Sequence, residues 1–315
     1  MPRGARKLDD EMFGVAEAGN TVPSADAEAL VVARAFEKRA RQVAQSLSGR
    51  FAWRTILWFV GVLAGWGIVA ALTLGGHISY WASVPISAIL IYFIFAPLHE
   101  AVHDNIVGRY KRLRFLEVLI GHISGFVLLA PYPGFRVLHL HHHQHTNDPM
   151  EDPDYWVKSN NYFMVILRCM VIQHIYIVHL FKIARNAVIM RAFIYEMIYI
   201  LAYFAIIAMA YAVGWGTQLM LLWILPGYLG VVLCPLMFDW PVHHPHNSQG
   251  RYTGSAILLF PKPLRFFLEI LFLGHSYHLM HHLFPRIPFY HYGKAYYALA
   301  PELATVGAKV QDLAF

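Results

Sequence analysis

Four long apolar stretches constrain the fold of this 315-residue chain more than any other feature of its sequence. None of them contains Lys, Arg, Asp or Glu, and they cover residues 55–74, 80–98, 197–213 and 217–238. About 20 helical residues are needed to cross the roughly 30 Å hydrocarbon core of a bilayer. The composition, 57% apolar and only 14% charged, agrees with burial in lipid. We therefore expect an all-α integral membrane protein with four transmembrane helices.

The positions of the basic residues predict how these helices are oriented. The loops 75–79 and 214–216 are short and uncharged, so each pair of apolar stretches is expected to form a hairpin. All 25 Lys and Arg residues then fall on the opposite side, which the positive-inside rule assigns to the cytoplasm. Both chain termini are predicted to lie on this side. The net charge of +6 flanks the spans, so we expect contact with anionic lipid headgroups and not with nucleic acid.

The sequence divides into three predicted parts. Residues 1–50 form a polar cytoplasmic N-terminal arm, residues 51–300 a membrane domain, and residues 301–315 a C-terminal tail. Two further apolar segments, 113–130 and 163–180, are interrupted by charged or polar residues that are costly in lipid. We expect them to lie at the interface or to be re-entrant, and the protein has six spans if both cross.

The end of the second apolar stretch carries a metal-binding pattern. His99, Glu100 and His103 match H-E-x-x-H, which on a helix binds zinc and supplies a glutamate base for peptide hydrolysis. Residues at i and i+4 share a helix face, so both imidazoles can reach one metal. This pattern alone would indicate a zinc membrane protease, which also requires a third ligand.

Two other segments repeat a related pattern of histidines. His139, His142 and His143 are spaced H-x-x-H-H, as are three histidines near the C-terminus, His278, His281 and His282. These eight imidazoles exceed the three protein ligands of a catalytic zinc, so they suit two metals. Imidazole binds zinc, copper, iron and nickel, and the ligand type alone does not choose among them. A metal transporter would place its ligands within the spans, whereas these lie outside them.

The three segments, HEAVH, HLHHHQHTNDPMEDPDYW and HLMHHLFPRIPFY, resemble the membrane-bound fatty acid desaturase and hydroxylase superfamily. Its three histidine boxes bind two irons on the cytosolic face of a four-helix membrane domain. The motifs HTNDP, DPD and DWPVHHPH are similar to a bacterial group that includes carotenoid hydroxylases and ketolases. The resemblance implies a cytosolic helical cap that carries the boxes, a bacterial inner membrane location, and iron ligation by His99, His103, His139, His142, His143, His278, His281 and His282.

The same resemblance implies a ninth ligand between the second and third boxes. His243 aligns with the first histidine of the relatives' pattern, but a shifted proline and an additional histidine leave His244 and His246 as alternatives. Metal-bound imidazoles usually donate their second N–H to a carboxylate or carbonyl group. The candidates for such outer contacts are Glu100, His145, Asp148, Asp152, Asp154, Asp239 and His246. For each aspartate, a solvated turn is the alternative interpretation.

The resemblance implies a dioxygen-dependent di-iron oxidoreductase that oxidises an unactivated C–H bond of a long-chain lipid entering from the bilayer. Its catalytic groups are the metal ligands themselves. A fatty acyl desaturase is the leading hypothesis. The alternatives are a carotenoid or alkyl-chain hydroxylase or ketolase, a fatty acid decarboxylase that forms a terminal alkene, and, more remotely, the zinc protease. The chain contains no recognisable electron-transfer module, so we expect a separate electron donor of the ferredoxin, rubredoxin or cytochrome type.

Overall fold

The computed structural model describes residues 25–313, and most of them are helical. Residues 1–24 of the predicted N-terminal arm lie outside the described residues. The helices are α1 (Ala25–Leu47), α2 (Trp53–Leu74), α3 (Tyr80–Phe93), α4 (Phe95–Val102), α5 (Arg114–Val127), α6 (Tyr132–His145), α7 (Tyr162–Cys169), α8 (Ile172–Ile183), α9 (Ala187–Ala212), α10 (Gly216–Leu219), α11 (Leu225–Phe238), α12 (Trp240–His243), α13 (Lys262–Leu271), α14 (His278–Leu283) and α15 (Tyr292–Thr305). The strands are β1 (Ile257–Leu259) and β2 (Val310–Asp312).

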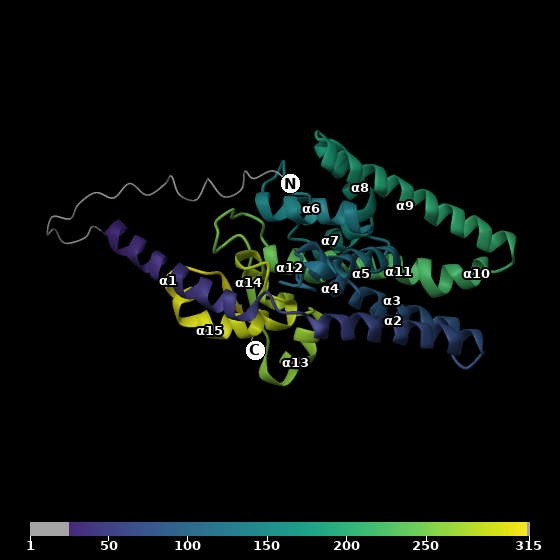
Figure 1. Cartoon of the computed structure of the whole chain (residues 1–315), viewed down its shortest axis with the longest axis horizontal. Coiled ribbons are helices and arrows are strands. Elements are labelled where there is room, and N and C mark those ends of the chain that lie inside the picture. Colours follow the sequence, from purple (N-terminus) through teal and green to yellow (C-terminus); the bar gives the residue numbers. More distant parts are fainter. Residues whose placement is uncertain (1–24, 314–315) are drawn as a thin grey trace.

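Four long apolar helical segments confirm the predicted membrane fold. They cover Trp53–Leu74, Tyr80–Val102, Ala187–Ala212 and Gly216–His243. Such segments form helices in lipid because a helix satisfies its backbone hydrogen bonds internally. Both hairpin turns lie at the same end of the molecule, on the right in Figure 1, while α13, α14 and α15 lie at the other end. The chain is therefore an integral membrane protein with a helical cap on one side.

The two central spans pack closely because one of them presents a glycine. At Gly230 of α11, an added Cβ would lie 3.1 Å from the backbone nitrogen of Tyr92 and 3.3 Å from the carbonyl oxygen of Ala88. Small residues at such contacts allow helix backbones to approach each other within a membrane. This contact holds α11 against α3, which leads directly into the first histidine box.

The two interrupted apolar segments form bent helix pairs. The axis bends by 98° between α5 and α6 and by 68° between α7 and α8. By length and composition, residues 25–313 contain four spans, or up to six if each bent pair counts as one. At the first bend, a Cβ on Gly125 would lie 2.6 Å from the carbonyl oxygen of Ala130, so only glycine fits. The buried Glu117 of α5 accepts hydrogen bonds from the backbone nitrogens of Ile106 and Val107 and so holds the loop after the first box.

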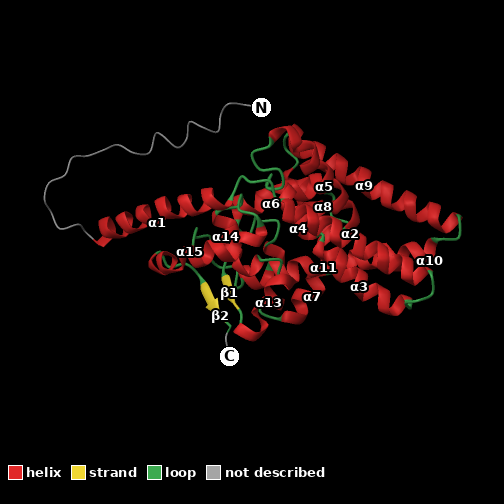
Figure 2. Cartoon of the chain, turned by 60° about the horizontal axis from the view of Figure 1, so that its bottom comes forward, coloured by secondary structure: helices red, strands yellow, loops and turns green. Residues whose placement is uncertain are grey.

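In the cap, segments near both ends of the described chain lie close to the last histidine box. The strands β1 and β2 form a parallel pair in which Ile257 lies opposite Val310 (Figure 2). The backbone nitrogen of Leu279 in α14 donates to the carbonyl oxygen of Ala256, just before β1. Helix α1 packs its buried face, which includes Phe36 and Ala40, beside α15. Helix α15 runs across residue 300, so the predicted boundary of the tail falls within a helix; the division into three parts remains a prediction.

Candidate metal centre

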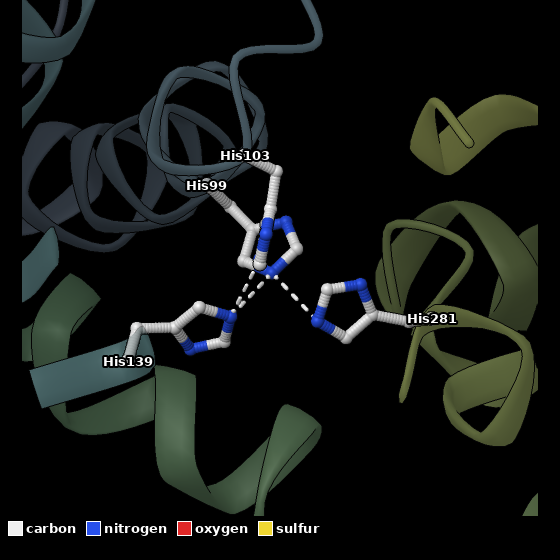
Figure 3. A group of neighbouring side chains, drawn as sticks. All are labelled: His99, His103, His139 and His281. Carbon is white, nitrogen blue, oxygen red and sulfur yellow. Dashed lines mark hydrogen bonds between the residues drawn. The ribbon is translucent and has the colours of Figure 1, made fainter. Parts of the chain in front are cut away.

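Five histidines from all three boxes form a first cluster of imidazole rings. The Nε2 atom of His139 lies 3.0 Å from that of His99, 2.9 Å from that of His103 and 3.0 Å from that of His143. The Nε2 atom of His281 lies 3.2 Å from that of His99 and 2.8 Å from that of His143. Figure 3 shows four of these rings pointing toward one another, His99 and His103 from the end of α4, His139 from α6 and His281 from α14.

Hydrogen bonds cannot account for this first cluster. A neutral imidazole carries one N–H, so the Nε2 atom of His139 can satisfy only one of its three nitrogen neighbours. A cation placed among the nitrogens satisfies all of them at once. Nitrogens bound to a transition metal at about 2.1 Å, at mutual angles of about 90–110°, lie about 3.0–3.4 Å apart. The observed separations of 2.8–3.2 Å agree with this requirement.

A second cluster lies beside the first and contains four histidines. The Nε2 atom of His282 lies 3.3 Å from that of His142 and 3.1 Å from that of His278. The ring of His243 completes the group, with its centroid 4.9 Å from those of His142 and His278 and 5.0 Å from that of His282. Its Nε2 atom is buried and has no hydrogen-bond partner among the described residues. These four side chains can hold one metal ion.

The H-x-x-H-H spacing divides each box between the two clusters. On α6, His139 and His143 belong to the first cluster, while His142, between them in sequence, belongs to the second. On α14 the division is reversed, because His278 and His282 belong to the second cluster and His281 to the first. Residues four apart share a helix face, whereas the intervening position is rotated away. The structure thus brings all nine predicted ligands together, as two adjacent groups.

Seven of the nine ligands are buried, whereas His143 and His282 are partly exposed. Relative exposure is 0% for His99 and His281 and 2% for His243. Burial, together with neighbouring imidazoles, holds the pKa of His281 and of His282 well below the usual value. These side chains are therefore neutral near pH 7, which is the state that binds a metal ion.

Carboxylate and carbonyl groups orient several of these rings. The Nδ1 atom of His142 donates to Oδ1 of Asp152 at 2.8 Å and lies 3.3 Å from Oδ2 of Asp154. Burial raises the pKa of Asp152, but the charge and hydrogen bond of His142, the backbone N–H of Asp154 and the charge of His243 together outweigh burial, so the net pKa is below the usual value. The Nδ1 atom of His243 donates to the carbonyl oxygen of Gly254 at 2.9 Å. Each contact leaves Nε2 free to bind a metal, as metal-bound histidines require.

Three candidates for outer contacts instead bond to other groups. Glu100 is fully buried and accepts hydrogen bonds from Nδ2 of Asn105 and from the backbone nitrogen of Phe289, so it links the first box to the loop after the third. Asp148 accepts from two backbone nitrogens of its own turn, and these bonds lower its pKa. The Nδ1 atom of His145 lies 3.1 Å from a backbone carbonyl oxygen, that of His141. Asp148 therefore belongs to a polar turn and does not contact a ligand ring.

Asp239 and His246 lie near the second cluster without contacting its rings through hydrogen bonds. Asp239 and His246 approach each other most closely at 3.9 Å, between Oδ1 of Asp239 and Nε2 of His246. Neither carboxylate oxygen of Asp239 has a hydrogen-bond partner among the described residues, nor does either ring nitrogen of His246. His246 is 6.0 Å from His243 between ring centroids. His243 therefore fits the second cluster and His246 does not.

Several site residues had no assigned role in the sequence. The hydroxyl group of Tyr292 lies 2.9 Å from Nδ1 of His281, and the ring of His275 packs 4.8 Å from that of His99. The Nδ1 atom of His275 donates to the carbonyl oxygen of Leu273, which leaves its buried Nε2 atom as a lone-pair acceptor. His275 precedes His278 by three residues, a spacing that could have marked it. No local pattern marks Tyr292.

An apolar cavity and a polar groove both lead to the clusters. The apolar cavity lies between α6, α8, α9 and α11 and reaches both clusters. Its walls include Phe95, Phe135, Leu180 and Phe238. A separate polar groove, lined by residues such as Gln144 and Arg251, reaches His143 and His282. The clusters therefore lie between an apolar chamber and a polar groove.

Comparison with known proteins finds the fatty acid desaturase family and proteins named as acyl-lipid desaturases. Residues 76–314 match the model of the fatty acid desaturase family. The chain is 26% identical over 224 residues to a sn-1 oleoyl-lipid 12-desaturase from Picosynechococcus, with 62% of each chain covered. It is also 30% and 28% identical to sn-1 acyl-lipid omega-3 desaturases (ferredoxin) from Synechocystis and Nostoc, over 32% and 35% of this chain and 26% and 32% of those proteins. The chain thus spans about three-fifths of the first relative's length and about a third or less of the other two.

The family match extends over most of the chain. It includes all three histidine boxes and three of the four apolar helical segments; the first segment, Trp53–Leu74, lies outside it. It agrees with the division of the histidines into two groups that can each hold a metal ion. The resemblance read from the box motifs is thereby confirmed, and the chain belongs to the fatty acid desaturase family.

Proposed function

We propose that this protein is a dioxygen-dependent oxidoreductase that holds two irons and desaturates the acyl chain of a long-chain lipid. The observation that carries this proposal is the position of two imidazole clusters at an apolar cavity beside the membrane-spanning helices. An apolar chamber next to a metal centre suits a substrate whose reacting carbon carries no polar group. The family relationship and the relatives named as acyl-lipid desaturases support the same class of reaction.

In this proposal each cluster holds one iron. The first iron would be bound by His99, His103, His139, His143 and His281, and the second by His142, His243, His278 and His282. When bound, the two irons supply the oxidising chemistry for an unactivated C–H bond, with dioxygen and external electrons as co-reactants. Asp152 fixes the tautomer and the orientation of His142, and the buried Phe95 and Phe238 help to keep water from the clusters.

Electrons are expected to come from a separate protein. The polar groove beside His143 and His282 offers a path from the surface to both clusters that does not pass through the apolar cavity. Two relatives carry ferredoxin in their names, which favours a donor of that type over rubredoxin or a cytochrome. The distribution of Lys and Arg favours a cytoplasmic position for this groove, at the inner membrane of a bacterial cell.

The zinc protease suggested by the H-E-x-x-H pattern has less support. His99 and His103 share their cluster with three further imidazoles, whereas that enzyme class requires an open position at its metal. The carboxyl group of Glu100 is engaged with Asn105 and Phe289 and does not lie among the clustered nitrogens.

The experiment that tests the proposal begins with metal content. Protein purified in mild detergent without added metal is expected to contain about two irons per chain. It is then supplied with ferredoxin, a ferredoxin reductase, dioxygen and phospholipid vesicles, and the released fatty acids are analysed by mass spectrometry. New double bonds support the proposal. Hydroxylated, ketonic or terminal-alkene products with two irons would replace desaturation by one of the related oxidations, and one zinc with no iron after iron reconstitution would overturn it.

A further inference from the structure

Glu196 places an unpaired carboxyl group in the wall of the apolar cavity. It lies within the membrane-spanning helix α9 and is half-buried. Among residues 25–313, no side chain or backbone group forms a hydrogen bond or an ion pair with it. An ionisable residue at such a position is costly unless a polar partner compensates it. The missing partner is therefore expected to enter the cavity from outside the chain.

A glycine on the facing helix makes room for this carboxyl group. A Cβ added to Gly134 of α6 would lie 2.2 Å from Oε2 of Glu196 and 3.1 Å from its carboxyl carbon. Any larger residue at position 134 would push the carboxyl group away from α6. Glycine within a helix costs about 1 kcal/mol relative to alanine, so position 134 is occupied by a residue that is unfavourable for the helix alone.

The carboxyl group and the metal clusters lie at different depths of one cavity. Gly134, Leu138 and His142 follow one another at intervals of four residues and so share a face of α6. With a rise of about 1.5 Å per residue, His142 lies about 12 Å further along the helix axis than Gly134. Glu196, Leu138 and His142 all line the cavity. A chain that occupies it can therefore contact Glu196 and the clusters at the same time.

We propose that Glu196 binds a hydroxyl group of the substrate, so that the preferred substrate is a long-chain lipid carrying a hydroxyl several carbons away from the oxidised C–H bond. A hydroxyl group both donates and accepts, so it satisfies the carboxyl group whether this is ionised or protonated. A plain alkyl chain offers neither contact. The carboxylate of a free fatty acid would be repelled by an ionised Glu196, and an ester carbonyl, which only accepts, can pair with Glu196 only when this group is protonated. This inference rests on the proposed function, because it concerns the substrate of the same cavity.

Binding without turnover tests this inference separately from the reaction. The full chain in detergent micelles is titrated with octadecanoate methyl ester and with a series of its hydroxylated positional isomers, and tryptophan fluorescence gives the affinity. The wild-type protein is expected to bind at least one mid-chain isomer about tenfold more tightly than the unsubstituted ester, as one added hydrogen bond to a carboxyl group allows. Equal affinities for all of the esters would overturn the proposal.

Two variants and a control variant test whether Glu196 causes the preference for the hydroxylated ester. Glu196→Leu is expected to lose the tenfold preference while it still binds the unsubstituted ester, and Gly134→Ala to weaken it by displacing the carboxyl group. Glu151→Leu removes a half-exposed carboxyl group outside the cavity and is expected to retain the preference. A Glu196→Leu protein with unchanged metal content that still prefers the hydroxylated ester would contradict the inference. If the wild-type preference holds but no desaturation is found, the proposed reaction fails and the binding site stands.

Discussion

His139 and His142 lie less than one turn apart on α6, yet their imidazoles belong to different clusters. Their ring centroids are 6.1 Å apart, and each ring lies closer to a ring from α14 than to the other: His139 to His281 at 5.5 Å, and His142 to His282 at 5.1 Å. One short helix therefore contributes to two metal positions at once. The geometry predicts that the two positions can be emptied separately.

The first prediction concerns metal content after removal of single ligands. His139→Ala is expected to lose the metal of the first cluster and His142→Ala that of the second, because each substitution removes a nitrogen from one group only. Each variant should contain about one iron where the wild type contains about two, and turnover should fall to background. Elemental analysis measures the content, and Mössbauer spectra should lose a different component in each variant. His122→Ala, which alters a ring bonded to Tyr199 and not to the clusters, serves as the control. Two full irons in His139→Ala or in His142→Ala would contradict the assignment.

The second prediction compares two aspartates of the same loop. Asp152→Asn removes the charged acceptor of His142 Nδ1 and is expected to weaken iron binding at the second cluster about 10- to 100-fold. Asp148→Asn alters a turn that has no contact with a ligand ring and should leave the affinity within about twofold. Iron titration of the metal-free proteins measures both effects, and thermal unfolding shows whether either variant is misfolded. Equal affinities in the two variants would argue against a role for Asp152.

The third prediction separates the three histidines of the segment after α11. His243→Ala is expected to lose about one iron, because its free Nε2 atom completes the second cluster. His244→Ala should keep both irons, since the ring of His244 packs against Trp240. His246→Ala should also keep both, since that ring lies 6.0 Å from His243 and outside the cluster. Iron loss in the His246 variant alone would move the ninth ligand to that position.

The fourth prediction concerns removal of the metal. Converging imidazole nitrogens bind a cation in the folded state only, so metal binding adds to the free energy of unfolding. A free metal concentration about 1,000 times the Kd corresponds to about 4 kcal/mol of stabilisation. The midpoint of thermal unfolding in detergent should therefore fall after treatment with an iron chelator and recover when Fe²⁺ is returned. An unchanged midpoint in protein shown to be free of metal would mean that the clusters are held by protein contacts alone.

The fifth prediction tests the orientation in the membrane. Cysteine is introduced at His77, in the loop between α2 and α3, and separately at Gln249, in the loop before β1; both positions are exposed. The native Cys169 and Cys234 are buried and should not interfere. A membrane-impermeant maleimide added to intact bacterial cells is expected to label the cysteine at position 77 and to leave that at position 249 unmodified until the cells are opened. The opposite pattern would invert the topology.

The sequence alone was sufficient to predict the membrane fold and the three histidine boxes. Stretches of about 20 residues without charge can satisfy their backbone in lipid only as helices, so hydropathy locates the spans. Helical spacing likewise shows that His99 and His103, four residues apart, can face one metal. The helix ends were less predictable. The third span begins at Ala187, ten residues before the predicted start, because helix α9 includes Arg191 and Glu196.

Tertiary structure decided how the ligands are shared and which other groups support them. His99 and His281 are 182 residues apart in sequence, and yet their Nε2 atoms lie 3.2 Å from each other. No local sequence pattern predicts that distance, because it depends on how α4 and α14 are placed relative to each other. The same holds for the pairing of His281 with Tyr292 and for the placement of Glu196 over Gly134. Local spacing determines which side chains share a helix face, whereas only the packing of distant helices determines which of those faces meet.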